Sequence, residues 1–239
     1  MKKLLLSFLV IAISCTAVLS QKTINDPNAE KRTVSSFHGI EVGTGIELTI
    51  IEGSMEELAI SAATADFRNK IVTKVENGIL KIYYESKMKS INKVKESKYL
   101  KAYVSYKSLD QLYATTGAEV KISGVLKASS LDMKVNTGAL VTGEVDINTL
   151  KISQHTGSKI TFTGKADKLI VDGNTGSKFK GDEMNTADCQ VTVSTGALVL
   201  VNAEKELMVK ANTGGNVKYK GNAIKKEIKR NTGGSVTKI

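Results

Sequence analysis

The sequence predicts an all-β protein, a right-handed parallel β-helix (solenoid) with coils of roughly 19 residues. The main observation is a phrase of Thr-Gly followed by Ala, Ser or Gly, which occurs seven times with steps of 21, 19, 19, 20, 18 and 19 residues between threonines. A period near 20 residues with a fixed turn indicates stacked structural repeats. The repeated threonines are Thr116, Thr137, Thr156, Thr175, Thr195, Thr213 and Thr232.

Alignment of the repeats on these threonines places apolar residues in fixed columns. Between the columns polarity mostly alternates with period two, as in a strand with one buried face. Stacked coils would superpose like residues in ladders, whereas an antiparallel up-and-down barrel would not require columns at a twenty-residue register. Four residues before the threonines stand Leu112, Met133, Ile152, Val171, Val191, Val209 and Ile228, and four residues after them Val120, Val141, Ile160, Phe179, Val199, Val217 and Val236.

Glycines predict where the coils turn. The Gly after each Thr is expected at a corner with positive φ, which glycine adopts at no steric cost. The threonine hydroxyls are expected to form a ladder by bonding to the backbone at successive corners. Right-handedness is expected from the usual hand of parallel crossovers. A second corner is predicted to end in Gly124, Gly143, Gly164, Gly181 and Gly221.

The first residues have the pattern of a targeting segment. Lys2 and Lys3 precede a largely apolar run, and residues 1–20 are predicted to be a signal peptide with Gln21 as the mature N-terminus. Lipoprotein processing at Cys15 is the alternative. Export would place the protein in the periplasm, at the cell surface or outside the cell, with no transmembrane segment after cleavage.

Residues 21–36 are predicted to form a flexible polar tether, because they hold the only proline and a cluster of turn-forming residues. This segment should be mobile unless it folds back over the first coil. Residues 37–239 are expected to form a single β-helix domain, with a less regular part at 37–107 and the seven Thr-Gly repeats at 108–239. The single domain fits a chain of 239 residues with no tryptophan and twenty glycines.

The less regular part still has strand-like alternation. Asn77-Gly78 separates two such runs and predicts a β-hairpin. Thr44-Gly45 matches the repeat corner, so an additional coil with a hairpin excursion is expected here.

The run from Phe37 to Val42, then Gly45-Ile46-Glu47, then Asn77 to Ile82 resembles the auto-transporter adhesin "head GIN" domain family. The resemblance covers about residues 33 to 237, and the third position of the Gly-Ile-Asn motif is Glu47 here. It implies a secreted or surface protein with a β-helical fold. The family has no established catalytic residue, so the resemblance implies none.

A basic excursion lies between residues 85 and 101. Its lysines could contact an anionic partner such as a polysaccharide or lipid head groups, although a solvated loop is the simpler interpretation. The near absence of interleaved aromatic residues disfavours nucleic acid. Removal of Lys2 and Lys3 leaves 32 basic and 24 acidic residues, a net charge of +8. The candidate contact residues are Lys87, Lys89, Lys93, Lys95 and Lys98.

Other reactive side chains are interpreted as structural. Cys189 occupies a column that holds leucine in other repeats, so it is expected to be a small core residue. His155 stands in the polar position before Thr156, and His38 has no neighbouring ligand, so neither suggests a metal site. No cofactor, metal site or catalytic residue is predicted, because the acidic residues of the repeats are scattered among different columns.

The sequence therefore predicts a non-enzymatic structural or interaction module of a bacterial envelope. The alternatives are a carbohydrate-active β-helix enzyme and an anionic glycan- or lipid-binding protein. The partner could be an envelope component, a glycan or a protein. The unpaired edge of the terminal coil leaves a homo-oligomer or a covering N-terminal segment open.

Overall fold

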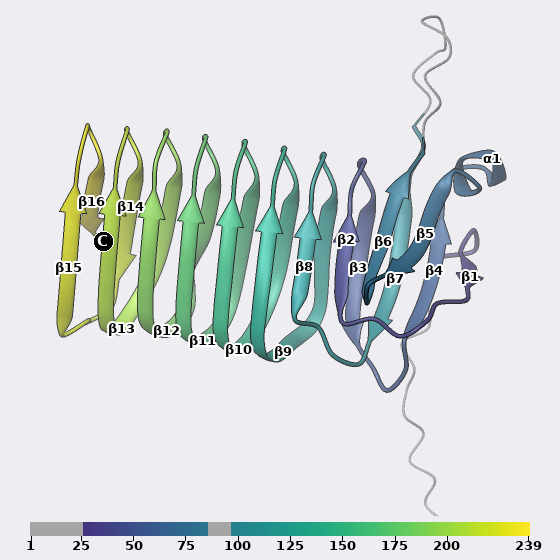
Figure 1. Cartoon of the computed structure of the whole chain (residues 1–239), viewed down its shortest axis with the longest axis horizontal. Coiled ribbons are helices and arrows are strands. Elements are labelled where there is room, and N and C mark those ends of the chain that lie inside the picture. The colour runs from purple at the N-terminus through teal and green to yellow at the C-terminus, as the bar shows by residue number, and fades with distance from the viewer. Residues whose placement is uncertain (1–25, 86–96) are drawn as a thin grey trace, which may run out of the picture.

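The computed structural model of the chain describes residues 26–85 and 97–239, and these residues form one β-solenoid. Each coil rises along one wall, turns at a Thr-Gly corner and descends along the opposite wall while advancing toward the C-terminus, which is a right-handed course (Figure 1). The predicted right-handed parallel β-helix is thereby confirmed. The predicted signal peptide, with Cys15 and the predicted mature N-terminus Gln21, lies outside the described residues.

The regular coils are built from strands that pair in parallel with their counterparts one coil away. The first coil comprises β2 (Gly39–Val42) and β3 (Glu47–Glu52), which pair with β8 (Gln111–Ala114) and β9 (Glu119–Val135). The expected additional coil at Thr44-Gly45 is therefore present. The stack continues through β10 (Leu140–Gln154), β11 (Lys159–Gly173), β12 (Lys178–Val193), β13 (Leu198–Ala211), β14 (Asn216–Lys220), β15 (Lys225–Arg230) and β16 (Ser235–Lys238).

The register superposes the predicted apolar columns. Val141 pairs with Val120 and Ile160, and Ile160 pairs with Phe179. These four side chains are at most 1% exposed, as is Met133 in the column on the other wall. Burial of such a side chain contributes about 1.5–3 kcal/mol, so the ladders supply the main stabilisation of the fold. Cys189 lies in register between Leu169 and Leu207, as the column predicts.

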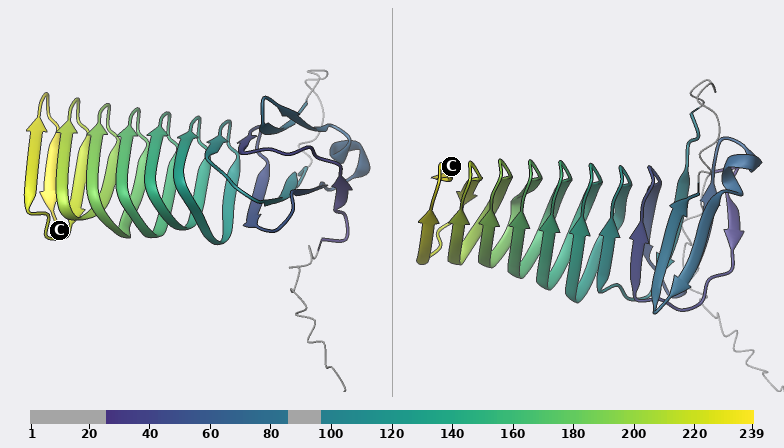
Figure 2. Two further views of the ribbon diagram at one scale, coloured as in Figure 1. Left: turned by 60° about the horizontal axis from the view of Figure 1, so that its bottom comes forward. Right: turned by 45° about the horizontal axis from the view of Figure 1, so that its top comes forward.

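At the predicted second corner, away from the Thr-Gly edge, the chain makes an open bend rather than a tight turn. Strands β9 to β13 run continuously from one wall to the other and bend on the way (Figure 2). A predicted glycine lies within each of β9 to β12, whereas β13 has none and Gly221 follows β14. Register shifts accompany the bend, for example between Thr142 and Glu144. Gly124, Gly164 and Gly221 have positive φ there, whereas Gly143 and Gly181 do not. Each coil thus has one tight corner and one open bend, which gives two long walls.

An outer layer covers the N-terminal end of the stack. Strand β6 (Ile79–Tyr84) pairs in parallel with β2, and β7 (Lys101–Tyr106) pairs in parallel with β3. Each of these two strands has an antiparallel partner on its other side. β5 (Ile71–Glu76) pairs with β6, and β4 (Glu57–Ser61) pairs with β7. The predicted hairpin at Asn77-Gly78 joins β5 to β6, and both turn residues have positive φ.

The segment expected to be a flexible tether folds back over this end, as far as it is described. β1 (Glu30–Arg32) pairs antiparallel with β4 beside the short helix α1 (Ala65–Arg68), whose N-cap is Thr64. These elements lie at the opposite end of the solenoid from β15 and β16 (Figure 1). Residues 21–25 lie outside the described residues.

Candidate functional site

The most regular surface feature is the edge formed by the Thr-Gly corners. At eight corners, from Thr44-Gly45 to Thr232-Gly233, both residues have positive φ, between 43° and 59° for threonine and between 67° and 74° for glycine. Two consecutive left-handed residues form a type I′ turn. Left-handed backbone is unusual for a β-branched residue. The sequence pattern predicted positive φ for the glycine but not for the threonine.

The corners are joined by the backbone. The Gly138 amide donates to the Thr156 carbonyl oxygen at 2.9 Å, and equivalent bonds of 2.9–3.2 Å join every corner to the next. The expected ladder of threonine hydroxyls bonded to backbone is therefore not what links the corners. Thr175 Oγ1 instead donates to the side chain of its neighbour Asn174. The threonines themselves are exposed, so this edge presents a straight row of hydroxyl groups.

The strands that flank the basic excursion lie beside the strands of the Thr44-Gly45 corner. β6, which ends at Tyr84, pairs in register with β2, and β7, which begins at Lys101, pairs in register with β3. The Lys98 ammonium lies 4.3 Å from the centre of the Tyr84 ring. This cation–π contact holds Lys98 against the outer layer at the N-terminal end of the stack, which we call the N-terminal cap. Lys87, Lys89, Lys93 and Lys95 lie outside the described residues.

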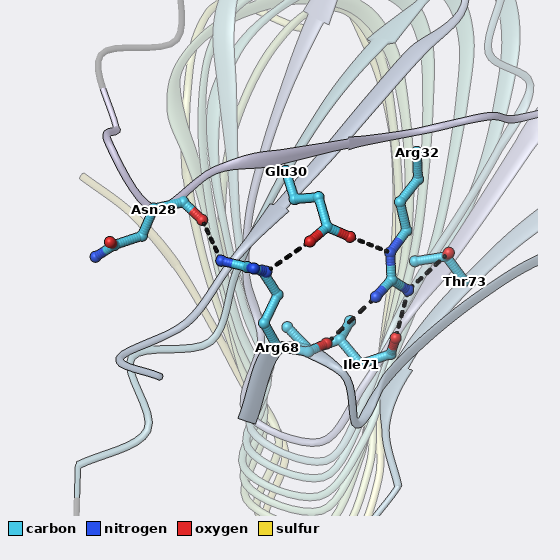
Figure 3. A network of polar contacts seen from close by, with 6 residues as sticks. All are labelled: Asn28, Glu30, Arg32, Arg68, Ile71 and Thr73. Carbon is cyan, nitrogen blue, oxygen red and sulfur yellow. Dashed lines mark hydrogen bonds and ion pairs between the residues drawn. The ribbon is translucent and has the colours of Figure 1, made fainter. Parts of the chain in front are cut away.

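A network of polar contacts that the sequence did not reveal fastens the N-terminal segment (Figure 3). Arg32 Nη1 donates to the carbonyl oxygen of Ile71 at 2.6 Å and to Thr73 Oγ1 at 3.2 Å. Glu30 lies between two arginines, with its Oε2 3.0 Å from Arg68 Nε. Burial lowers the pKa of Arg32, although the neighbouring Glu30 opposes this shift. The network joins β1, α1 and β5 and is structural.

A second contact of the N-terminal segment involves a tyrosine on β7. Tyr103 Oη donates to Asp26 Oδ2 at 2.9 Å. Burial and this bond raise the pKa of Tyr103 to about 12. Burial alone would raise the pKa of Asp26, but hydrogen bonds from Tyr103, Asn28 and Ser61 outweigh burial and lower it. The chain is thus anchored to the solenoid from residue 26 onward.

The histidines and the cysteine have structural surroundings. His38 Nδ1 lies 2.7 Å from Asp110 Oδ1. The imidazole ring packs against Gly78, in the turn of the hairpin. The backbone of His155 takes part in its corner, as expected for that position. Cys189 is buried beside Thr186, and burial raises the pKa of its thiol to about 11. A thiol with so little thiolate at neutral pH is a poor nucleophile.

The carboxylates of the described residues are dispersed. Asp182 and Glu183 both contact Lys220 Nζ, at 3.3 and 3.0 Å, and Asp146 contacts Lys165 at 3.3 Å. Over residues 26–85 and 97–239 no group of three or more His, Cys, Asp or Glu side chains is placed to hold a metal ion. No helix in this part of the chain has the length and hydropathy of a membrane span.

Comparison with known proteins gives one family and several related folds. The family model described as "Putative auto-transporter adhesin, head GIN domain" matches residues 36–223. A search of curated proteins found no match.

Solved structures of similar fold include proteins from Bacteroides and Parabacteroides species. A putative adhesin from Bacteroides fragilis superposes with a TM-score of 0.78 at 16% identity, covering 88% of this chain and 96% of its own. A putative adhesin from Parabacteroides merdae gives 0.70 at 15%, covering 88% and 95%. A structure described as a "Putative lipid binding protein" from Parabacteroides distasonis gives 0.64 at 18%, covering 90% and 98%. At these identities the likeness establishes the fold.

Proposed function

This chain belongs to the family described as "Putative auto-transporter adhesin, head GIN domain", and from that premise we propose that it is a non-enzymatic interaction module of a bacterial envelope. In this role the solenoid is a rigid support, and its walls, its corner edge and its loops contact the partner. The family description supports an adhesive role, and the bacterial structures of the same fold carry similar descriptions.

The observation that carries the proposal is the uninterrupted stack. Eight corners superpose along one edge and are tied by backbone hydrogen bonds of 2.9–3.2 Å. Such stacking produces long surfaces that repeat at about 4.8 Å. The titratable groups described above serve in surface ion pairs, in the N-terminal network or in the core. An extended, regular surface of this kind suits contact with an extended partner.

A binding screen of the purified mature protein against envelope components and glycans tests this role. We expect retention on at least one such component, measured at low and at physiological salt concentration. Hydrolysis or lysis of a glycan that is abolished by a single acidic substitution would contradict the proposal and favour a carbohydrate-active enzyme.

We also propose export. Lys2, Lys3 and the apolar run that follows support this, as does the adhesin description of the family. Mass spectrometry of the protein recovered from the native host is expected to find Gln21 at the N-terminus. A lipid-modified Cys15 would instead establish anchoring as a lipoprotein, and a retained Met1 would contradict export.

The second candidate function is binding of an anionic glycan or lipid. The net charge of +8 after removal of Lys2 and Lys3 favours it, and one relative of the same fold is described as a lipid binding protein. If the basic excursion forms the contact, neutralising Lys87, Lys89, Lys93 and Lys95 should abolish salt-sensitive retention on such ligands. Unchanged retention would exclude the excursion as the binding element.

A further inference from the structure

The two walls of the solenoid present differently charged outer surfaces. We define the post-corner face as the outward residues three and five positions after the threonine on β10 to β14. This face contains four lysines and no acidic residue. Its members are Leu140, Thr142, Lys159, Thr161, Lys178, Lys180, Leu198, Leu200, Asn216 and Lys218.

The lysines of the post-corner face are neighbours in the sheet. Lys159 and Lys178 are register partners on β11 and β12, and Lys180 is separated from Lys218 only by Leu200 on β13. With strands about 4.8 Å apart, the four ammonium groups span four adjacent strands. None of the four makes an ion pair with any residue in the described part of the chain.

Leucines occupy the middle of this basic surface. Leu198 is paired in register with Lys178, and Leu200 lies between Lys180 and Lys218. Both leucines point outward and are half-buried. Leu140, on β10, is 37% exposed. The face therefore combines unpaired positive charge with apolar side chains, on a sheet over which no described part of the chain packs.

Acidic residues border the post-corner face without entering it. Glu144, Asp182 and Glu183 lie at the open bend, and Lys220 engages the last two. Glu119, on β9, is the register partner of Leu140.

The opposite wall, the pre-corner face, mixes both signs. Its outward positions include Asp132, Asp172 and Glu227 among lysines, and Glu227 pairs with Lys229 at 2.8 Å. The part of the post-corner wall on β10 to β14 is therefore purely basic, whereas the pre-corner face carries charges of both signs.

We propose that the post-corner face docks on an anionic lipid bilayer surface. Positive side chains near such a surface are attracted to the head groups, and the leucines gain by leaving water at the boundary with the acyl chains. A soluble anionic polysaccharide would account for the lysines but not for the leucines. The face carries no aromatic residue on which a sugar ring could stack. The inference rests on the proposed interaction role and specifies its surface and partner.

Co-sedimentation with vesicles tests the proposal. The protein is mixed with vesicles of phosphatidylcholine that contain about one third phosphatidylglycerol, and with vesicles of phosphatidylcholine alone. We expect binding to the anionic vesicles only. A variant with Lys159→Gln, Lys178→Gln, Lys180→Gln and Lys218→Gln should bind at least about tenfold more weakly. The matched control removes the same charge from the other wall, by Lys134→Gln, Lys151→Gln, Lys168→Gln and Lys210→Gln, and should bind as the parent does.

A second variant, Leu198→Ser with Leu200→Ser, separates a bilayer from a soluble polyanion. It should weaken vesicle binding and leave retention on dextran sulfate unchanged, with circular dichroism confirming that each variant is folded. Equal losses in both lysine variants, binding that survives the post-corner variant, or indifference to the leucine substitutions would overturn the proposal. Absence of vesicle binding, with retention on another envelope component, would overturn this inference alone and leave the interaction role standing.

Discussion

Glycines of the tight corner and of the open bend differ in what an added side chain would meet. A Cβ at Gly157, with φ of 67°, would have nothing within 4 Å, whereas a Cβ at Gly164, with φ of 97°, would overlap the carbonyl oxygen of Val145. Gly157→Ala should therefore cost about 1 kcal/mol of unfolding free energy from φ alone, and Gly164→Ala about 3 kcal/mol or more, because the backbone must also move. Urea unfolding of the two variants measures the difference, and equal losses would contradict the predicted overlap.

Threonine at a left-handed position should be strained relative to asparagine. The chain itself uses Asn77 before glycine in its type I′ hairpin, with φ of 52°, and uses threonine at the corners with similar φ. Because asparagine tolerates this region better, Thr156→Asn is expected to raise the unfolding free energy by about 1 kcal/mol.

The control for this substitution is Thr142→Asn, in a strand, where asparagine is less favourable than threonine. It should lower stability slightly. If Thr156→Asn is also destabilising, contacts between neighbouring corner threonines must outweigh the backbone strain.

At the scale of the elements, the N-terminal cap should depend on Arg32. Its side chain is 22% exposed and bonds to Ile71 and Thr73, whereas the adjacent Lys31 is 82% exposed. Because the substitution leaves partly buried acceptors unpaired, Arg32→Ala should cost about 2 kcal/mol of local unfolding free energy, and Lys31→Ala less than about 0.5 kcal/mol.

Solenoids open locally, so the measurement is amide hydrogen exchange in β1, β4 and β5. Protection there should fall in Arg32→Ala and be retained in Lys31→Ala. Unchanged protection in both variants would show that the network does not fasten the cap.

The Tyr103–Asp26 contact should make this cap sensitive to alkali. The folded-state pKa of Tyr103 is about 12 and its ordinary value is 10.0, so its neutral form is favoured by folding. Its contribution is present below pH 10 and is lost as the pH rises from 10 toward 12. The lowered pKa of Asp26 acts in the opposite range, and its contribution is lost as the pH falls below about 4.

Tyr103→Phe should therefore be less stable than the parent at neutral pH and should lose less stability between pH 10 and pH 12. Burial also raises the pKa of Tyr106, so part of the alkaline loss should remain. Urea unfolding at several pH values measures how steeply the unfolding free energy of the parent and of the variant falls with pH. Identical slopes for the two proteins would show that Tyr103 does not cause the alkaline loss of stability.

The elements that repeat could be predicted from the sequence, and those that do not repeat could not. Because seven repeats can be aligned, a position that is ambiguous in one repeat is identified by its counterparts in the others. Cys189 could therefore be predicted to be buried, since its column holds leucine in other repeats. The contacts of Arg32 join residues 36 to 41 positions apart, outside the Thr-Gly repeats. No periodic pattern in the sequence therefore predicts them. The post-corner face was missed because its lysines belong to different coils, with 19 positions between Lys159 and Lys178 and 38 between Lys180 and Lys218, and become neighbours only through stacking.

At the scale of the whole molecule, one physical cause explains both the fold and the proposed function. Coils of about 19 residues cannot bury their apolar columns alone, so they stack, and stacking turns scattered side chains into continuous rows. The buried rows stabilise the solenoid. The exposed rows supply the hydroxyl edge and the basic face that the proposals assign to binding.

The distance between two far corners tests this stacking most directly. Spin labels on Thr116→Cys and Thr232→Cys are separated by six coil steps, so pulsed electron paramagnetic resonance should give one narrow distribution near 29 Å, from about 4.8 Å per step. The buried Cys189, with its raised pKa, should stay unlabelled in the folded protein. A broad distribution, or a distance far from this value, would contradict the superposition of the coils.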